Sequence, residues 1–261
     1  MIGLILGTSE GKKIVSLLNK FTDDLFITTA TSYGGELLKE FRYKELNSKP
    51  LSKGELKKII EEKNINIIID ASHPYALEIT KMTKAICREL SIDYLRYERA
   101  SIIDKFKEEK NIVLVENYEE AFEKLKDIEG TVLNTTGSRN IDKFVHSDLN
   151  NRVIHRVLPS VSVMEKCIGL GLDIGDIIAM KGPIGYDLNR GFIKEYSAVA
   201  MILKDSGVQG GTEEKIKAAL DSDILAIVIK RSEEEYSKAF NNEKDLVDYI
   251  NINYFQKGRV L

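Results

Sequence analysis

The sequence has few cysteines and no long apolar run. Cys87 and Cys167 are the only cysteines among 261 residues, and each lies in a helical apolar pattern outside any C-x-x-C motif. This spacing argues against a disulfide or a metal cage and fits a reducing cytoplasm. The chain opens with a strand pattern rather than a leader, and no stretch approaches about 18 consecutive apolar residues. We therefore expect neither a signal peptide nor a membrane span.

Charge and missing motifs exclude further classes of function. The 38 Lys and Arg residues against 41 Asp and Glu residues give a net charge of −3, so no global basic field favours nucleic acid or an anionic membrane. No Tyr-x-x-x-Lys, G-x-S-x-G, Walker A or H-E-x-x-H motif occurs. Short-chain dehydrogenase, esterase, NTPase and zincin chemistry therefore lack their characteristic residues. The scattered basic residues still allow a local site for a small anion.

What the sequence does contain is a repeated alternation of strand and helix patterns. In the first part, strands are expected at Ile2–Leu6, Leu25–Ala30, Ile65–Ile69 and Tyr94–Tyr97, and helices at Gly11–Lys20, Leu51–Lys63 and Ala76–Leu90. Such βαβ repetition predicts a parallel sheet with helices on both faces. The charged, weakly patterned stretch Arg99–Asn111 suggests a boundary. We expect a dinucleotide-binding domain over residues 1–102 and a substrate domain over residues 103–261.

The second part repeats the theme. Strands are expected at Ile112–Val115, Thr131–Leu133, Val153–Val157, Ile177–Met180, Ala198–Leu203 and Ile224–Ile229, and helices at Tyr118–Leu125, Val161–Leu170, Glu213–Leu220 and Lys244–Ile250. The predicted fold is α/β, with two Rossmann-like lobes, mostly parallel sheets and a cleft between them. Clefts between lobes are common ligand sites.

The most informative segment is Asp70-Ala71-Ser72-His73-Pro74-Tyr75-Ala76, which follows a buried strand pattern. In open α/β sheets the ligand crevice lies at such strand ends, and the proline makes this turn rigid. We interpret its polar side chains as facing a ligand: His73 could donate to a phosphate, orient a nicotinamide or touch the substrate. The alternatives are a structural histidine in the turn and an Asp70 that caps the following helix.

Two further segments of the first lobe have the composition of a nucleotide site. In Gly7-Thr8-Ser9 a strand runs into a glycine and then a helix, whose free N–H groups can bind an anion. The segment lacks the regular G-x-G-x-x-G spacing, and an ordinary turn capped by Ser9 explains it equally well. Thr31-Ser32-Tyr33-Gly34 follows the second strand, where dinucleotide folds meet the adenosine ribose. A plain glycine loop is the alternative there.

Candidate substrate-binding residues in the second lobe are polar or basic, and each lies at or just after the end of a predicted strand. They are Thr136, Ser138, Arg139, Arg156, Lys181, Lys204 and Ser206. Arginine binds carboxylates in bidentate fashion, so several such residues on one edge would form an anion-binding wall. Singly, each basic residue would be a solvated surface charge. Lys204 could neutralise a carboxylate or supply a proton, or could simply reach solvent.

Taken in order, these segments resemble the family of precorrin-6A and cobalt-precorrin-6A reductases of cobalamin biosynthesis. The resemblance runs from residue 2 to about residue 231. The matching motifs are Ile5-Leu6-Gly7-Thr8-Ser9-Glu10, Asp70-Ala71-Ser72-His73-Pro74-Tyr75-Ala76, Arg96-Tyr97-Glu98-Arg99, Thr135-Thr136-Gly137-Ser138 and Lys204-Asp205-Ser206-Gly207. It implies an oxidoreductase that uses NADH or NADPH to transfer hydride to a macrocyclic tetrapyrrole, whose neighbouring carbon is then protonated.

The resemblance also implies roles for residues. The expected cofactor-binding residues are Gly7, Thr8, Ser9, Thr31, Ser32, Tyr33, Gly34, Ser72 and His73. Tyr75 and Arg99 join the substrate-binding candidates, Lys204 and His73 are the expected catalytic residues, and no metal site is expected. The second strand lacks an arginine at its tip, which favours NADH slightly. Richness in Lys, Ile and Asn hints at a cobalt-bearing substrate, and contact with neighbouring corrin-pathway enzymes is a further expectation.

Two other classes of function use the same kind of two-lobed fold. One is a transferase that uses a nucleotide or S-adenosylmethionine, with the Gly7 turn holding that ligand instead of a nicotinamide dinucleotide. The other is a non-catalytic nucleotide sensor. Titration with NADH and NADPH distinguishes the three.

Overall fold

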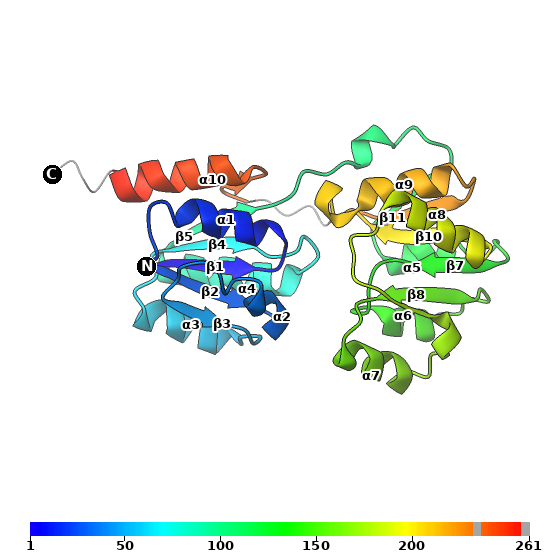
Figure 1. Ribbon diagram of the computed structural model, residues 1–261, viewed down its shortest axis with the longest axis horizontal. Helices are drawn as coiled ribbons and strands as arrows, with labels where there is room; N and C mark the ends of the chain where they lie inside the picture. Colours follow the sequence, from blue (N-terminus) through cyan, green and yellow to red (C-terminus); the bar gives the residue numbers. More distant parts are fainter. Residues whose placement is uncertain (232–235, 257–261) are drawn as a thin grey trace. The chain divides into compact units, whose positions relative to one another are not determined.

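The computed structural model describes residues 1–231 and 236–256, which form two α/β units (Figure 1). Residues 1–99 and the segment 236–256 form the first unit, and residues 100–231 form the second. Each unit has one six-stranded sheet in which all strand pairs are parallel. The predicted class, two Rossmann-like lobes with parallel sheets, is confirmed. In the part of the chain described, no helix is long and apolar enough to cross a membrane.

The first sheet has the strand order of a dinucleotide-binding fold. From one edge to the other its strands are β12 (Ala239–Phe240), β5 (Asp93–Tyr97), β4 (Ile67–Ala71), β1 (Ile2–Leu6), β2 (Leu25–Thr29) and β3 (Glu45–Asn47). The chain runs outward from β1 through β2 to β3 and then returns to β4 on the other side of β1. The order therefore reverses between β1 and β4, and ligands of such sheets bind where the order reverses.

Successive residues of each strand point to opposite sides of the sheet, and both sets are buried because helices cover both faces. The helices are α1 (Glu10–Leu18), α2 (Ser32–Glu36), α3 (Lys53–Glu62), α4 (Leu77–Leu90) and α10 (Glu243–Ile250). Leu4 of β1 faces the core formed with α1 and α10, whereas Ile5 faces the core formed with α3 and α4. Ser52 begins α3 with a capping box.

The C-terminal segment corrects the predicted domain boundary. The expected second domain ran to residue 261, but β12 pairs with β5 and α10 packs against α1, so both belong to the first unit. Glu243 anchors this return: its carboxylate lies 2.9 Å from Nζ of Lys13 and accepts a hydrogen bond from the Tyr97 hydroxyl at 3.1 Å. The apolar face of α10 buries Leu246, Val247 and Ile250. Residues 257–261 lie outside the described residues.

The second sheet also reverses its order near the centre. Its strands are β6 (Ile112–Val115), β11 (Leu225–Ile229), β10 (Ala198–Lys204), β7 (Thr131–Asn134), β8 (Val153–Val157) and β9 (Ile177–Ala179). The chain moves outward from β7 to β9, then crosses back to β10 and continues to β11. The carboxyl ends of β7 and β10 are therefore neighbours at the point of reversal.

The helices of the second unit are mostly short. They are α5 (Tyr118–Glu123), α6 (Ile141–Val145), α7 (Val161–Gly169), α8 (Tyr186–Glu195) and α9 (Thr212–Leu220), and the 3₁₀ turns are η1 (Ile103–Lys105), η2 (Ile174–Asp176) and η3 (Val208–Gly210). The main core gathers Leu133, Met201 and Val228 from the sheet with Ile216 of α9. The sequence did not predict α2, α6, α8, β3 or β12.

Candidate functional site

The first unit brings its predicted cofactor residues to one edge of the sheet. Residues 7–9 follow β1, residues 72–75 follow β4, and residues 31–34 follow β2. Because β1 pairs in parallel with both β2 and β4, the three segments lie side by side at the carboxyl ends of the strands. Thr31 caps α2 by accepting a hydrogen bond from the Gly34 amide at 3.1 Å, and Tyr33 is exposed. This edge is the candidate dinucleotide site.

The turn after β1 offers donors for an anion. Gly7 and Ser9 are exposed, and in the described part of the chain the backbone N–H groups of Thr8 and Ser9 have no hydrogen-bond partner. The Thr8 hydroxyl donates to the Ala71 carbonyl oxygen at 3.4 Å, which ties the turn to β4. Free N–H groups at the positive end of α1 fit a diphosphate.

A glycine is needed at position 7 for packing. A Cβ atom there would lie 3.1 Å from the backbone nitrogen of His73 and 3.3 Å from Cα of Ser72. The side chain would therefore strike the neighbouring turn.

We expect Gly7→Val to lower the thermal unfolding midpoint and the dinucleotide affinity together, because the added side chain must displace the turn after β4. Thermal unfolding and fluorescence titration measure the two effects. Gly54→Val is the control, since a Cβ atom at Gly54 meets no atom within 4 Å. An unchanged midpoint for Gly7→Val would refute the packing argument.

A buried ion pair lies beside this turn. Arg99, which the resemblance assigned to the substrate, is 7% exposed and holds the buried Glu10 of α1 through Nε and, at 2.7 Å, through Nη2. It also donates to the Ser9 hydroxyl at 3.3 Å. Burial alone would raise the pKa of the Glu10 carboxyl, but the bonds from Arg99 outweigh it and lower the pKa below its ordinary value. Arg99 thus supports the turn after β1, and its contact with the substrate stays a prediction.

A second buried network fixes the turn after β4. Asp70 is fully buried and accepts hydrogen bonds from the hydroxyls of Thr80 at 2.9 Å and Tyr94 at 2.7 Å, while Nη1 of Arg96 lies 2.9 Å from its carboxylate. The same Arg96 nitrogen donates to the Ser72 hydroxyl at 3.1 Å. The Asp70 and Ser72 side chains therefore face the interior. Asp70 is therefore directed away from the edge, whereas the cofactor contact of Ser72 stays a prediction, and the Ser72 backbone forms part of the edge.

His73 and Tyr75 remain partly accessible at the edge. Nδ1 of His73 accepts a hydrogen bond from the Tyr75 amide at 3.3 Å, and the two ring centroids are 5.8 Å apart. With Nδ1 as the acceptor, the neutral ring carries its proton on Nε2. The histidine thus stabilises the turn, as the structural alternative supposed, and its side chain is partly exposed.

In the second unit, Lys204 lies at the carboxyl end of β10 against the turn after β7. It is 9% exposed, and its Nζ donates to the Thr136 carbonyl oxygen at 3.4 Å. The same nitrogen lies 5.7 Å from the ring centroid of Tyr118. Lys204 is therefore a held cation rather than a strand-terminal lysine in solvent, and Tyr118 shapes its environment.

The Thr136 hydroxyl is part of an internal chain of polar groups. It accepts a hydrogen bond from the Tyr118 hydroxyl at 2.9 Å and donates to Oδ1 of Asn134 at 2.7 Å. Asn134 in turn pairs with Nδ1 of His155 at 3.0 Å. Burial lowers the pKa of His155 to about 4, so its ring is neutral near pH 7. The Thr136 side chain thus fixes the turn after β7, and its contact with the substrate stays a prediction.

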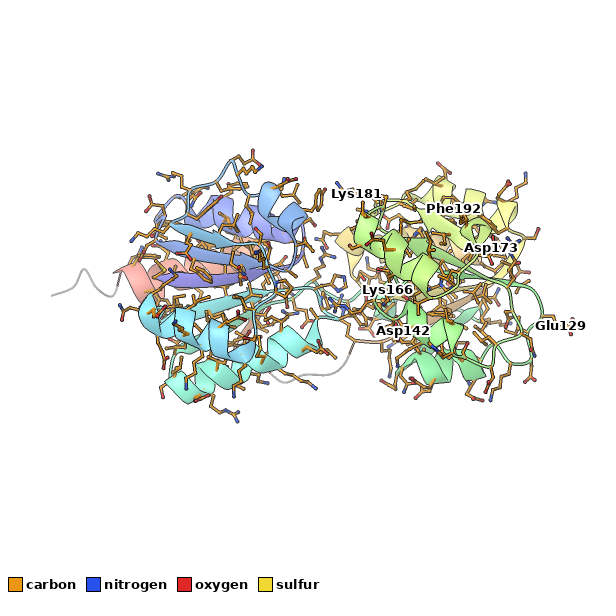
Figure 2. All side chains as sticks on the ribbon, turned by 90° about the horizontal axis from the view of Figure 1, so that it is seen from below. Glu129, Asp142, Lys166, Asp173, Lys181 and Phe192 are labelled. Carbon is orange, nitrogen blue, oxygen red and sulfur yellow. The ribbon has the colours of Figure 1, made fainter. Side chains whose placement is uncertain are left out.

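The other substrate candidates differ in accessibility. Arg139 and Lys181 are exposed, Ser138 and Arg156 are half-buried, and Ser206 is buried. Lys166 of α7 stabilises the turn after β7 by donating to the carbonyl oxygens of Ser138 at 2.9 Å and Arg139 at 2.8 Å. Figure 2 labels Lys166 and Asp142, its 3.4 Å ion-pair partner, as well as Lys181.

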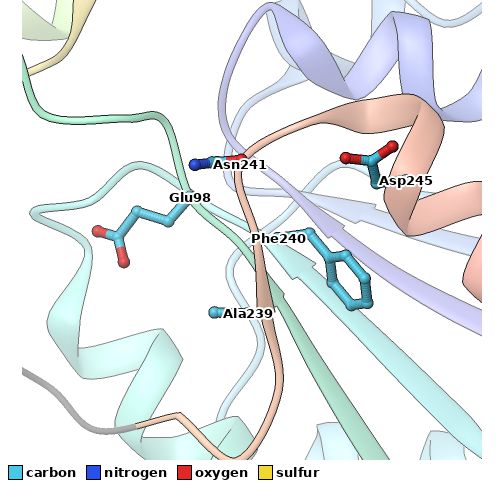
Figure 3. A pocket seen from close by; sticks show the side chains of 5 residues that line it. All are labelled: Glu98, Ala239, Phe240, Asn241 and Asp245. Atoms are coloured by element: carbon cyan, nitrogen blue, oxygen red, sulfur yellow. The ribbon is translucent and has the colours of Figure 1, made fainter.

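A shallow pocket in the first unit lies away from the point where the strand order reverses. Glu98, Ala239, Phe240, Asn241 and Asp245 line it where β5 pairs with β12 (Figure 3). Its charged groups are carboxylates, which do not suit a diphosphate. Over residues 1–231 and 236–256, no cluster of His, Cys, Asp or Glu side chains could hold a metal ion.

The sequence analysis missed several residues that shape these edges. Arg96 interrupts the apolar strand Tyr94–Tyr97, and a charge inside a central strand signals a buried partner. Lys215 lies on the same helical face as Thr212 and Ile216, which are buried, so its position in the 3.6-residue period was a signal. Tyr118 gave no such signal, because its partners are far away in the sequence.

Comparisons with known proteins agree with this geometry. A family model described as precorrin-6x reductase CbiJ/CobK matches residues 1–251. The cobalt-precorrin-6A reductase of Methanocaldococcus jannaschii is 38% identical over 95% of this chain and 96% of its own length, and that of Priestia megaterium is 32% identical over 95% and 96%. A solved structure described as CobK precorrin-6A reductase superposes with a TM-score of 0.77 and 14% identity, covering 96% of both chains.

Proposed function

Because the chain belongs to the precorrin-6x reductase family CbiJ/CobK, it is an oxidoreductase of cobalamin biosynthesis, and we propose that it reduces cobalt-precorrin-6A with NADH or NADPH. The observation that carries the proposal is the near full-length similarity to relatives named cobalt-precorrin-6A reductase. The two reversal points, one in each sheet, give a place for a dinucleotide and a place for an acidic substrate.

The first unit supplies the residues that would hold the dinucleotide. The N–H groups of Thr8 and Ser9 would bind the diphosphate, and residues 31–34 would lie near the adenosine. His73 and the backbone of Ser72 would lie on the nicotinamide side. When bound, the dinucleotide supplies a hydride to one carbon of a conjugated C=C bond in the macrocycle. Holding the reacting atoms close together would remove several kcal/mol, on the order of 7–11, from the barrier.

The second unit supplies the residues for the substrate and the proton. Carboxylate side chains of the macrocycle would meet Arg139, Arg156 and Lys181, which end or follow neighbouring strands. Lys204 would stabilise the negative charge that develops on the ring and deliver the proton to the adjacent carbon. The C=C bond thereby becomes a CH–CH bond.

The choice of dinucleotide follows from the tip of β2. No arginine or lysine occurs between Thr29 and Glu36, so a 2′-phosphate would lack the cation that usually meets it there. We therefore propose that NADH binds at least as tightly as NADPH.

A fluorescence titration with NADH and NADPH, followed by turnover with cobalt-precorrin-6A, tests the proposed function. We expect saturable binding of the dinucleotide in the titration. We expect its oxidation only when the tetrapyrrole is present. Absence of binding of both dinucleotides at millimolar concentration would exclude the reductase. Binding without oxidation by any tetrapyrrole would indicate a nucleotide sensor, and binding of S-adenosylmethionine instead would indicate a transferase.

A further inference from the structure

Two basic residues of the second unit, Arg156 and Lys215, lie in largely buried surroundings. Arg156 is on β8, and its Nη1 donates to Oδ1 of Asn189 in α8 at 2.7 Å. Asn189 is held in turn, because its amide donates to the carbonyl oxygens of Ile184 at 3.0 Å and Gly185 at 2.8 Å. Lys215 of α9 is 6% exposed and donates to the Gly210 carbonyl oxygen at 3.1 Å.

Neither cation has a carboxylate within ion-pair distance among the residues that the structure describes. Burial lowers the pKa of Arg156 to about 10. Burial, together with repulsion from Arg156, lowers the pKa of Lys215 to about 7, and Glu214 opposes this only in part. One carboxylate oxygen of Glu214 is itself buried without a hydrogen-bond partner. Buried cations are normally paired, so this arrangement is electrostatically incomplete.

We propose that Arg156 and Lys215 form a binding subsite for one carboxylate side chain of the tetrapyrrole, with Asn189 orienting the guanidinium. The proposal rests on the proposed function and adds Lys215, which no sequence motif indicated. The carboxylate would accept hydrogen bonds from both cations and supply the negative charge that they lack. Since Arg156 is half-buried and Lys215 buried, the ion pairs would be shielded from water and stronger than surface pairs.

Removing the charge of Lys215 should weaken binding of the tetrapyrrole without lowering the stability of the protein. In the absence of ligand, burial and repulsion from Arg156 both disfavour the charged form of Lys215, so its ammonium group is unfavourable for folding. Lys215→Met keeps most of the apolar stem and removes the charge. We expect this variant to unfold at the same temperature as the wild type or higher, while the KM for the tetrapyrrole rises about 10- to 100-fold, as for lost hydrogen bonds to charged groups.

Proton uptake gives an independent signature of Lys215. Arg156 and Glu214 are the charged groups that act on it, and an added carboxylate would favour its protonated form. At pH 8, where free Lys215 is mostly neutral, wild-type protein should therefore take up nearly one more proton than Lys215→Met on binding the tetrapyrrole. Calorimetry in buffers of different ionisation enthalpy measures this difference.

The experiment compares wild type, Lys215→Met, Arg156→Gln and the control Lys217→Met by KM, by calorimetric binding of the reduced tetrapyrrole and by thermal unfolding. Lys217 lies two residues along α9, is exposed and pairs with Glu213. The subsite is supported if Lys215→Met and Arg156→Gln raise the KM for the tetrapyrrole without changing NADH affinity. The control Lys217→Met should behave like the wild type. An unchanged KM, or a lowered unfolding midpoint for Lys215→Met, overturns the subsite. Wild-type protein that neither binds nor reduces the tetrapyrrole overturns the proposed function and the subsite with it.

Discussion

Replacing Lys204 with alanine is expected to lower turnover about 100-fold or more while dinucleotide affinity stays near the wild-type value. Lys204 belongs to the second unit, where its Nζ lies against the Thr136 carbonyl oxygen and the Tyr118 ring. The candidate dinucleotide edge belongs to the first unit. If Lys204 has the proposed role, loss of its side chain would remove charge stabilisation and proton delivery without changing the turn after β1. Single-turnover oxidation of NADH with tetrapyrrole present, and fluorescence titration without it, measure the two quantities.

The matched control is Lys126→Ala, because the Lys126 side chain is 55% exposed and pairs only with Glu123 among the described residues. It should leave both quantities unchanged. A collapse of dinucleotide affinity in Lys204→Ala would mean that the roles of the two units are assigned wrongly. Full turnover by the variant would mean that another group supplies the proton.

Most strands of both sheets could be predicted because parallel strands covered on both faces are continuously apolar. The run ending at Ile69 and the run Ala198–Leu203 are of this kind, and both are central strands. The edge strand β3 and the two-residue β12 have no such run. Helix Tyr186–Glu195 was missed because an exposed Leu188 and an interior Gly191 weaken its period. The return of the chain to the first unit depends on packing between distant segments, which local patterns do not encode.

The location of the candidate site was also accessible from sequence, whereas the direction of its side chains was not. Polar residues after central strands indicated which segments lie together at the carboxyl ends, since parallel strands end together. Asp70 and Thr136 nevertheless turn inward to partners such as Arg96 and Tyr118. The bond between Glu10 and Arg99 joins residues 89 positions apart. Spacing rules cannot reveal such pairs, and a polar residue at a strand end can as well support a turn as touch a ligand.

The buried pair of Arg96 and Asp70 leads to the largest expected effect on stability. Both side chains are almost inaccessible to solvent, at 1% and 0%, with Nη1 of Arg96 2.9 Å from the carboxylate. Arg96→Met would leave a buried carboxylate that retains its hydroxyl partners but loses its counter-charge. Removing one partner of a buried pair costs about 3–5 kcal/mol, and we expect the free energy of unfolding in urea to fall by that amount in the variant.

Two comparisons separate the lost charge from lost packing. Lys57→Met, which breaks a partly exposed pair with Glu89, should lower stability far less than Arg96→Met, because solvent screens the exposed pair. The double variant Asp70→Asn with Arg96→Met should recover part of the loss, because the uncompensated charge is then gone. If Arg96→Met is as stable as the wild type, the pair does not hold the turn after β4. If the loss is as expected, dinucleotide affinity should fall with it, since Arg96 also fixes Ser72 beneath the edge where the nicotinamide would lie.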